Sequence, residues 1–152
     1  MAKVTKAVGA ALMSGYKSPK VCPPATKDIT LNLKNRDHTI KEYGYGPINP
    51  GEPSDDFWKK KAQMWDTNVV EAKTARCGNC AAFIQTKQIL DCITTGIGLE
   101  DDEPREVQIL EMGQAEAIQA AANLGYCQLF HFKCAGDRTC NSWLMGGPIT
   151  DI

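Results

Sequence analysis

The sequence has almost no net charge, no long apolar run and few histidines. Lys and Arg total 17 against 18 Asp and Glu, a formal net charge of −1. It therefore lacks the basic excess of a general nucleic-acid binder or of a protein that binds anionic membranes. No stretch approaches the ~18 consecutive apolar residues that a membrane-spanning helix needs. We expect neither nucleic acid nor membrane among the partners.

Recognisable catalytic motifs are also missing. The sequence contains no nucleophile elbow, no phosphate-binding loop and no dinucleotide fingerprint. Its two histidines, His38 and His131, stand far apart in the chain. We expect a binding protein rather than an enzyme, with no catalytic residues to assign.

The first residues do not make a convincing export signal. A short apolar run from Ala7 to Met13 follows two lysines, but no small-residue cleavage site comes after it. We therefore expect a protein of the cytoplasm, where thiols stay reduced and clustered cysteines more often bind metal than form disulfides.

The length of 152 residues fits one small, largely irregular α+β domain with short helices and a minor antiparallel sheet. Residues 1–53 are rich in Pro and Gly and are interpreted as an extended arm. Alternating apolar residues within it predict a strand at 29–33, and 38–43 is expected to return as the second strand of a hairpin. Residues 54–152 are expected to form a helical, cysteine-rich domain that holds the functional site.

Three helices are predicted in that second region. The first is capped by Ser54, restarts near Asn68, and should bury its apolar stripe against the cysteine-rich half. Two others are expected at 80–94 and at 107–124, the latter ending at Gly125 as a C-cap. The stripe of the first helix recurs at steps of four and three residues and consists of Trp58, Ala62, Trp65, Val69 and Ala72.

Seven cysteines are many for this length, and six of them lie in the second half. Cys77-Gly-Asn-Cys80 is a C-x₂-C pair, whose spacing lets one turn of chain present both sulfurs to one metal or cluster. Cys22, alone in the first half, is expected to be a bystander. Cys92 and Cys134 are interpreted as small core residues or as a redox pair.

The remaining spacing favours a cubane iron–sulfur cluster over zinc. Zinc ribbons usually have a second tight pair of ligands, which the widely spaced later cysteines do not offer. A cubane accepts thiolates from separate segments, because each binds a different iron. We predict a [4Fe-4S] site on Cys77, Cys80, Cys127 and Cys140, with Cys134 as the alternative fourth ligand. Zinc, buried free thiols and disulfides remain the other interpretations.

Three short motifs resemble the high-potential iron–sulfur proteins. Cys77-Gly-Asn-Cys80-Ala-Ala-Phe83 is similar to the segment of their first two ligands, Gly125-Tyr-Cys127-Gln-Leu-Phe130 to that of the third, and Cys140-Asn-Ser-Trp143 to that of the fourth. The resemblance implies a [4Fe-4S] protein for single-electron transfer. Aromatic residues beside these cysteines are expected to form a dry shell over the cluster, namely Phe83, Tyr126, Phe130, Phe132 and Trp143.

A second resemblance covers more of the chain. The block from Asp55-Asp56-Phe57-Trp58 to Arg76-Cys77-Gly78-Asn79-Cys80, with the ending from Trp143 to Ile152, is similar to small uncharacterised proteins of tailed bacteriophages. It implies a virus-encoded protein, found in the host cytoplasm or in the virion. The alternative function is then a structural or assembly component, in which the metal staples the fold and the N-terminal half contacts protein partners.

Overall fold

The computed structural model describes residues 16–98 and 105–150, and within them the chain forms the small α+β fold that the sequence predicts. The helices of this part are short, and none is long and apolar enough to cross a membrane. They are α2 (Pro24–Lys27), α3 (Ile29–Tyr43), α4 (Asp55–Met64), α5 (Val69–Ala72), α6 (Lys87–Gly98) and α7 (Arg105–Ala122), with a 3-10 turn, η1, at Cys77–Asn79.

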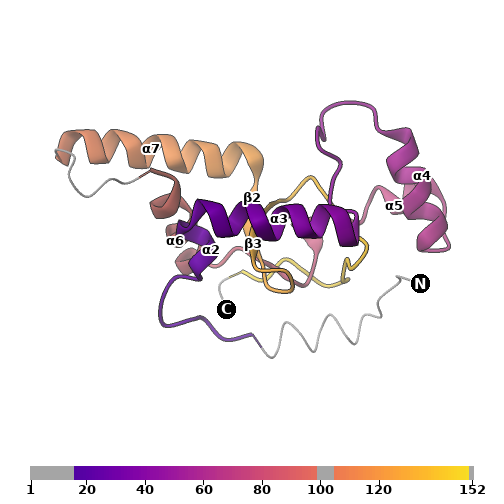
Figure 1. Ribbon diagram of the computed structural model, residues 1–152, viewed down its shortest axis with the longest axis horizontal. Coiled ribbons are helices and arrows are strands. Elements are labelled where there is room, and N and C mark those ends of the chain that lie inside the picture. The colour runs from indigo at the N-terminus through magenta and orange to yellow at the C-terminus, as the bar shows by residue number, and fades with distance from the viewer. Residues whose placement is uncertain (1–15, 99–104, 151–152) are drawn as a thin grey trace.

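A small antiparallel sheet lies at the middle of the molecule (Figure 1). Its strands β1 (Phe83–Ile84), β2 (Leu124–Cys127) and β3 (Phe132–Ala135) are hydrogen-bonded in that order. Phe83 pairs with Cys127, and Gly125 pairs with Cys134. Because paired residues share a face and alternate residues of a strand do too, Cys127 and Cys134 project from the same face of the sheet.

Three groups of buried residues make up the core. The central cluster contains the buried cysteines together with Tyr45, Phe83, Phe132 and Leu144. The α4–α5 cluster lies at one end of the molecule and the α6 cluster at the other, with α3 crossing between them (Figure 1). Trp143 packs against both the central cluster and the α4–α5 cluster, so it joins the two.

Residues 29–43 form one helix, so the predicted hairpin in this segment is wrong. The helix begins where the side chain of Asp28 accepts a hydrogen bond from the backbone N–H of Leu31, at 3.0 Å. It ends at Gly44, whose φ of 60° is the left-handed conformation that glycine adopts without strain. Both capping signals are present in the sequence.

The alternation that suggested a strand does not reflect burial. Ile29 is 65% exposed and Leu33 is 40% exposed, so two of the three alternating apolar residues face solvent. Leu31 and Ile40 pack against the core, and polar contacts also join the helix to the segment of β3. Asn32 accepts a hydrogen bond from the backbone N–H of Lys133 at 2.7 Å, and Asn35 donates one to the carbonyl of His131 at 2.7 Å.

The predicted apolar stripe is confirmed in α4 and α5. Trp58, Ala62, Trp65 and Ala72 are buried, and Val69 packs against them. The restart is also confirmed, since Asn68 accepts a hydrogen bond from the backbone N–H of Glu71 at 2.8 Å and caps α5. Ser54 makes no side-chain cap at the start of α4.

The other two helices exist but their bounds differ from the prediction. The segment expected as helix 80–94 contains β1 first, and α6 starts only at Lys87. α7 continues through Gly113 and stops before Asn123, which has a φ of 47°. Gly125 is therefore a strand residue rather than a C-cap, and a Cβ there would lie 2.5 Å from the Phe83 ring. The predicted arm residues 1–15 and the acidic run 100–103 lie outside the described residues.

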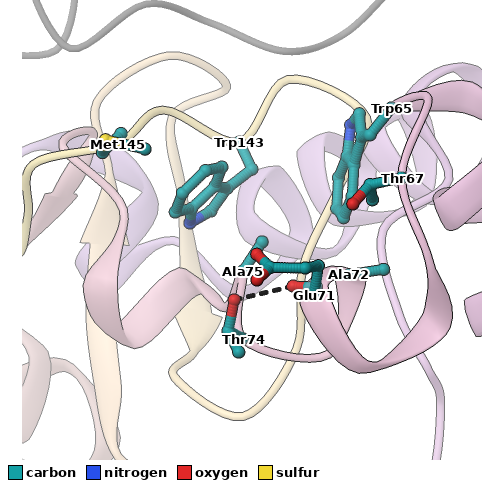
Figure 2. Close-up of a pocket in the computed structure, with 8 residues that line it drawn as sticks. All are labelled: Trp65, Thr67, Glu71, Ala72, Thr74, Ala75, Trp143 and Met145. Carbon is teal, nitrogen blue, oxygen red and sulfur yellow. Dashed lines mark hydrogen bonds between the residues drawn. The ribbon is translucent and has the colours of Figure 1, made fainter.

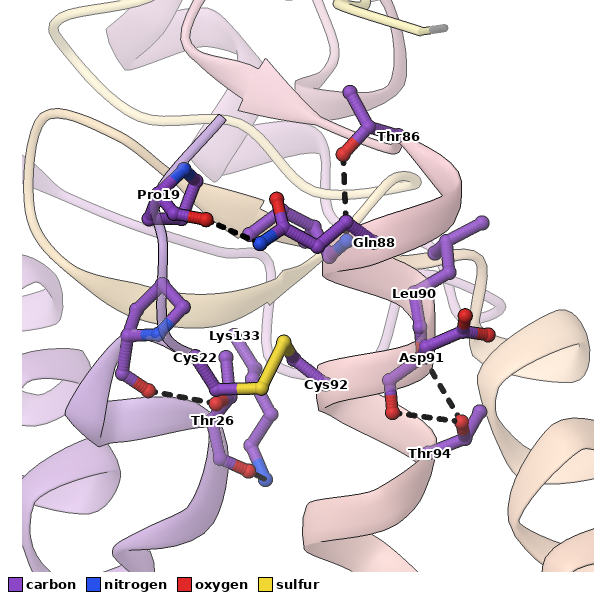
Figure 3. The surroundings of a disulfide bond; sticks show 12 residues. Pro19, Cys22, Thr26, Thr86, Gln88, Leu90, Asp91, Cys92, Thr94 and Lys133 are labelled. Carbon is purple, nitrogen blue, oxygen red and sulfur yellow. Dashed lines mark hydrogen bonds between the residues drawn. A yellow bond between two sulfur atoms is a disulfide. The ribbon is translucent and has the colours of Figure 1, made fainter. Parts of the chain in front are cut away.

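A disulfide joins Cys22 to Cys92, as Figure 3 shows. It ties the segment before α2 to α6, and the side chain of Gln88 adds a hydrogen bond to the carbonyl of Pro19. Cys22 is therefore not a bystander, and Cys92 and Cys134 do not form a redox pair, although both are buried in the core as the other interpretation expected. Pairings of this kind cannot be deduced from spacing alone.

Candidate metal centre

The five free cysteines of the chain line a single small cavity of about 20 Å³. They come from three separate segments: the η1 turn, the β2–β3 hairpin and the chain that follows β3. The structure therefore brings the four predicted ligands together and adds a fifth thiol that was only an alternative. The five are Cys77, Cys80, Cys127, Cys134 and Cys140.

The C-x₂-C pair is presented by a tight turn. The backbone N–H of Cys80 donates to the carbonyl of Cys77 at 2.9 Å, which closes η1. The N–H of Cys77 donates to the carbonyl of Arg138 at 2.6 Å, anchoring the turn to the chain after β3. A Cβ on Gly78 would lie 3.1 Å from the carbonyl oxygen of Gly136, so this close approach favours a glycine.

Trp143 couples the segment of Cys140 to this turn. Its indole N–H donates to the carbonyl of Arg76 at 3.0 Å and to the side-chain oxygen of Asn79 at 2.9 Å. The same oxygen of Asn79 accepts a hydrogen bond from the backbone N–H of Arg76 at 3.0 Å. The C-x-x-W motif therefore fixes the position of the C-x-x-C motif.

Backbone N–H groups point at two of the sulfurs. Cys80 Sγ accepts from the N–H groups of Ala82 and Leu144, each at 3.4 Å. Cys127 Sγ accepts from the N–H of Phe130, also at 3.4 Å. Hydrogen bonds of this kind favour the thiolate over the thiol and tune the electronic properties of a bound metal or cluster.

Burial works in the opposite direction on most of these thiols. It raises the pKa of Cys80 to about 12 and raises the pKa values of Cys134 and Cys140 well above the ordinary range. The pKa of Cys127 is lowered, because the thiol of Cys134 donates a hydrogen bond to its sulfur. A bound metal would supply the positive charge that buried thiolates otherwise lack, and its binding would release protons.

Electrostatic contacts distinguish the two candidates for the fourth ligand. Cys140 interacts with Cys77, Cys127 and Cys80, which are the other three predicted ligands. Cys134 interacts with Cys77 and Cys127 and is fully buried between them. Both thiols line the cavity, so the geometry leaves either one available as the fourth ligand.

The expected aromatic shell is only partly at the cavity. Phe83 and Phe130 line it, and Phe130 stacks on Tyr43 with ring centroids 4.4 Å apart. Trp143 packs against the central cluster but does not line the cavity. Its contact with the site runs through Arg76 and Asn79.

The donor set of the cavity consists of thiols. Within residues 16–98 and 105–150, no group of three or more His, Cys, Asp or Glu side chains is arranged to hold a single metal ion. Zinc would need four ligands around one centre, with sulfurs about 2.3 Å from it. A cubane spreads its thiolates over separate irons, and the cavity lining offers sulfur with no carboxylate or imidazole beside it. The cavity of about 20 Å³ is smaller than a cubane, so the thiols would have to lie further apart around a bound cluster.

A buried lysine next to the site escaped the sequence analysis. Lys61 is 5% exposed, and its ammonium donates to the side-chain oxygen of Asn141 at 2.7 Å. Burial lowers its pKa, while electrostatic attraction to Cys140 opposes that shift. Its position three residues after Trp58 places it on the buried face of α4, which is the signal that could have identified it.

No family model matches this chain, and neither a curated protein nor a solved structure is similar to it.

Proposed function

We propose that this protein binds a [4Fe-4S] cluster through Cys77, Cys80, Cys127 and Cys140, and that the cluster transfers single electrons or staples the fold. The observation that carries the proposal is the convergence of free, buried thiols from three segments on one cavity. The same protein contains a disulfide elsewhere, yet these neighbouring cysteines are not paired with one another.

The surroundings of the thiols support a bound cluster over an ordinary core. Backbone N–H groups donate hydrogen bonds to the sulfurs of Cys80 and Cys127. Such hydrogen bonds stabilise the thiolate form, which is the form that binds a cluster. Phe83 and Phe130 give the cavity an apolar wall. Such a lining disfavours the more highly charged reduced state of a four-thiolate cubane, so we propose a high-potential couple.

Metal analysis of protein purified without air tests the proposal directly. Iron and acid-labile sulfide should be present in equal amounts, about four of each per fully loaded chain. Stoichiometric zinc without sulfide, in protein never exposed to added zinc, would contradict it. Absence of any metal after expression with iron and sulfide supplied would contradict it too.

Serine substitutions test the ligand assignment. Replacing any one of the four proposed ligands should strongly lower cluster occupancy, because a hard hydroxyl is a poor substitute for a soft thiolate. Cys22→Ser is the control for loss of a cysteine outside the cavity, measured where the variant is fully folded because the change also breaks the disulfide. The control should keep the occupancy of the unmodified protein.

A specific observation also favours the alternative function, a virion or assembly component whose metal only holds the fold. Large apolar side chains are strongly exposed in the N-terminal half, including Val21, Ile29, Ile48 and Val70. Where such side chains adjoin one another, they form the kind of apolar surface that protein partners cover. Of the two expected locations, the disulfide favours the virion, because disulfides are uncommon in a reducing cytoplasm. Cluster absorption that does not change reversibly with oxidant and reductant would favour this alternative.

A further inference from the structure

We propose that a second cavity, between Trp65 and Trp143, binds the alkylated ammonium group of a small organic cation. The cavity has a volume of about 110 Å³, the share of three or four waters in the liquid. Figure 2 shows the two indoles on either side of it, with Glu71 below. The proposal does not depend on a metal at the cysteines.

The indoles form a V-shaped pair that suits a cation. Their ring centroids are 6.4 Å apart and their planes are inclined at 49°. Figure 2 shows Trp65 nearly edge-on, with one face turned toward Trp143. A charge at the mouth of the V can lie within about 6 Å of both centroids, which is the range of effective cation–π attraction.

The charge of the lining is negative. Glu71 is the one ionisable residue among the eight that line the cavity, and its side chain reaches toward the space below the indoles (Figure 2). Thr74 donates its hydroxyl to the backbone carbonyl of Glu71, not to the carboxylate. Within the described part of the chain the carboxylate has no hydrogen bond or ion pair of its own.

Nearby cations of the protein do not occupy the cavity. Arg76 lies over the ring of Trp58, at 4.5 Å from its centroid, and donates to the carbonyls of Lys73 and Asp137. It thereby stacks on another indole and does not cover the parts of Trp65 and Trp143 that line the cavity. The carboxylate and the two rings are thus without a cationic partner from this chain's described residues.

The lining favours an alkylated ammonium over a primary one. Both indole N–H groups are already used, Trp65 donating to the carbonyl of Asn141 and Trp143 to Arg76 and Asn79. A primary ammonium is strongly hydrated and would have to replace its water contacts with Glu71 and the hydroxyls of Thr67 and Thr74. An alkylated ammonium carries its charge on methyl groups, which lose little hydration and match aromatic walls.

Choline and its neutral isostere 3,3-dimethylbutan-1-ol are the probes that test the charge. Calorimetry on the full-length protein should show choline binding about tenfold tighter, since two ring faces and a carboxylate together favour the cation by about 1.4 kcal/mol. In nitrogen-15 NMR spectra, the indole N–H signals of Trp65 and Trp143 should shift on titration. That of Trp58 should not, because its ring is covered by Arg76.

Equal binding of the two probes would overturn the proposal, and so would binding of neither. Glu71→Gln should weaken choline binding severalfold without affecting the isostere. Glu42→Gln, a matched change at an exposed position of α3, should leave both affinities unchanged. A trimethyllysine peptide tested beside choline distinguishes a peptide-borne cation from a free one. If the ligand is a free small cation, choline should bind at least as tightly as the peptide.

Discussion

Breaking the Cys22–Cys92 disulfide should lower the free energy of unfolding by about 4 kcal/mol. The two cysteines are separated by 70 positions in sequence. In the chain-entropy description, a cross-link that closes a loop of this length removes about 15 cal/mol/K from the unfolded chain, or about 4 kcal/mol at 25 °C. Cys22→Ser is the milder way to break it, because Cys22 is half-buried whereas Cys92 is in the core.

Urea unfolding followed by circular dichroism measures the effect, with both proteins at the same metal loading. The midpoint should fall, and the dependence on urea should steepen because the unfolded chain without a bridge exposes more surface. Unmodified protein whose bridge has been reduced should unfold like the variant, which separates loss of the bridge from any effect of the serine.

A destabilisation below about 1 kcal/mol would refute this reasoning, because the entropy of a loop this long cannot be so small unless the unfolded chain is already compact. A peptide map under non-reducing conditions gives an independent check. If the peptides of Cys22 and Cys92 run separately, the bridge is absent from the native protein and the α2 segment is held to α6 only by its other contacts.

Further predictions concern the α4–α5 cluster, the metal centre and one tyrosine. Trp65→Ala should cost about 3–5 kcal/mol in urea unfolding, the range for large aromatic truncations in cores, whereas Met64→Ala at the exposed neighbouring position should cost less than about 1 kcal/mol. Cys140→Ser should empty the centre more completely than Cys134→Ser in iron analysis, and the reverse order would reassign the fourth ligand. Electron paramagnetic resonance should show a cubane signal after ferricyanide, and a signal that appears only with dithionite would reject the high-potential couple. Burial raises the pKa of Tyr126 to about 12. Since a free tyrosine titrates near 10, the free energy of unfolding should fall as the pH rises from about 10 to 12, and Tyr126→Phe should remove that part of the decline.

The sequence was most informative where several residues carried one pattern. The stripe of Trp58, Ala62 and Trp65 predicted a buried helical face, and the structure buries all three. The convergence of the C-x₂-C pair with distant cysteines was predicted from spacing, and five thiols do line one cavity. The pattern could not separate Cys134 from Cys140, because a strand pairing that places Cys134 beside the site is invisible in the sequence.

The errors came from short patterns. Ile29, Leu31 and Leu33 alternate for only five residues, too few to outweigh the caps at Asp28 and Gly44 that define a helix there. Gly125 was assigned to a helix end because glycine is common there, but its real constraint is the Phe83 ring above it. That constraint is a tertiary contact between strands some forty positions apart, and no local rule contains it.

The pairing of β1 with β2 has a consequence for how this chain can be re-engineered. Ile84 and Tyr126 face each other across the sheet, so the whole segment that contains α6 and α7 leaves and returns at adjacent points. The segment is thus a long connection between two adjacent antiparallel strands, which a tight turn could join directly. Four of the five free thiols lie in η1, β2, β3 and the chain after them, and the fifth, Cys80, immediately follows η1. A shortened chain that closes β1 onto β2 by a turn would therefore keep every thiol, while α6, α7, the disulfide and the hydrogen bond of Gly136 to Asn123 would be given up.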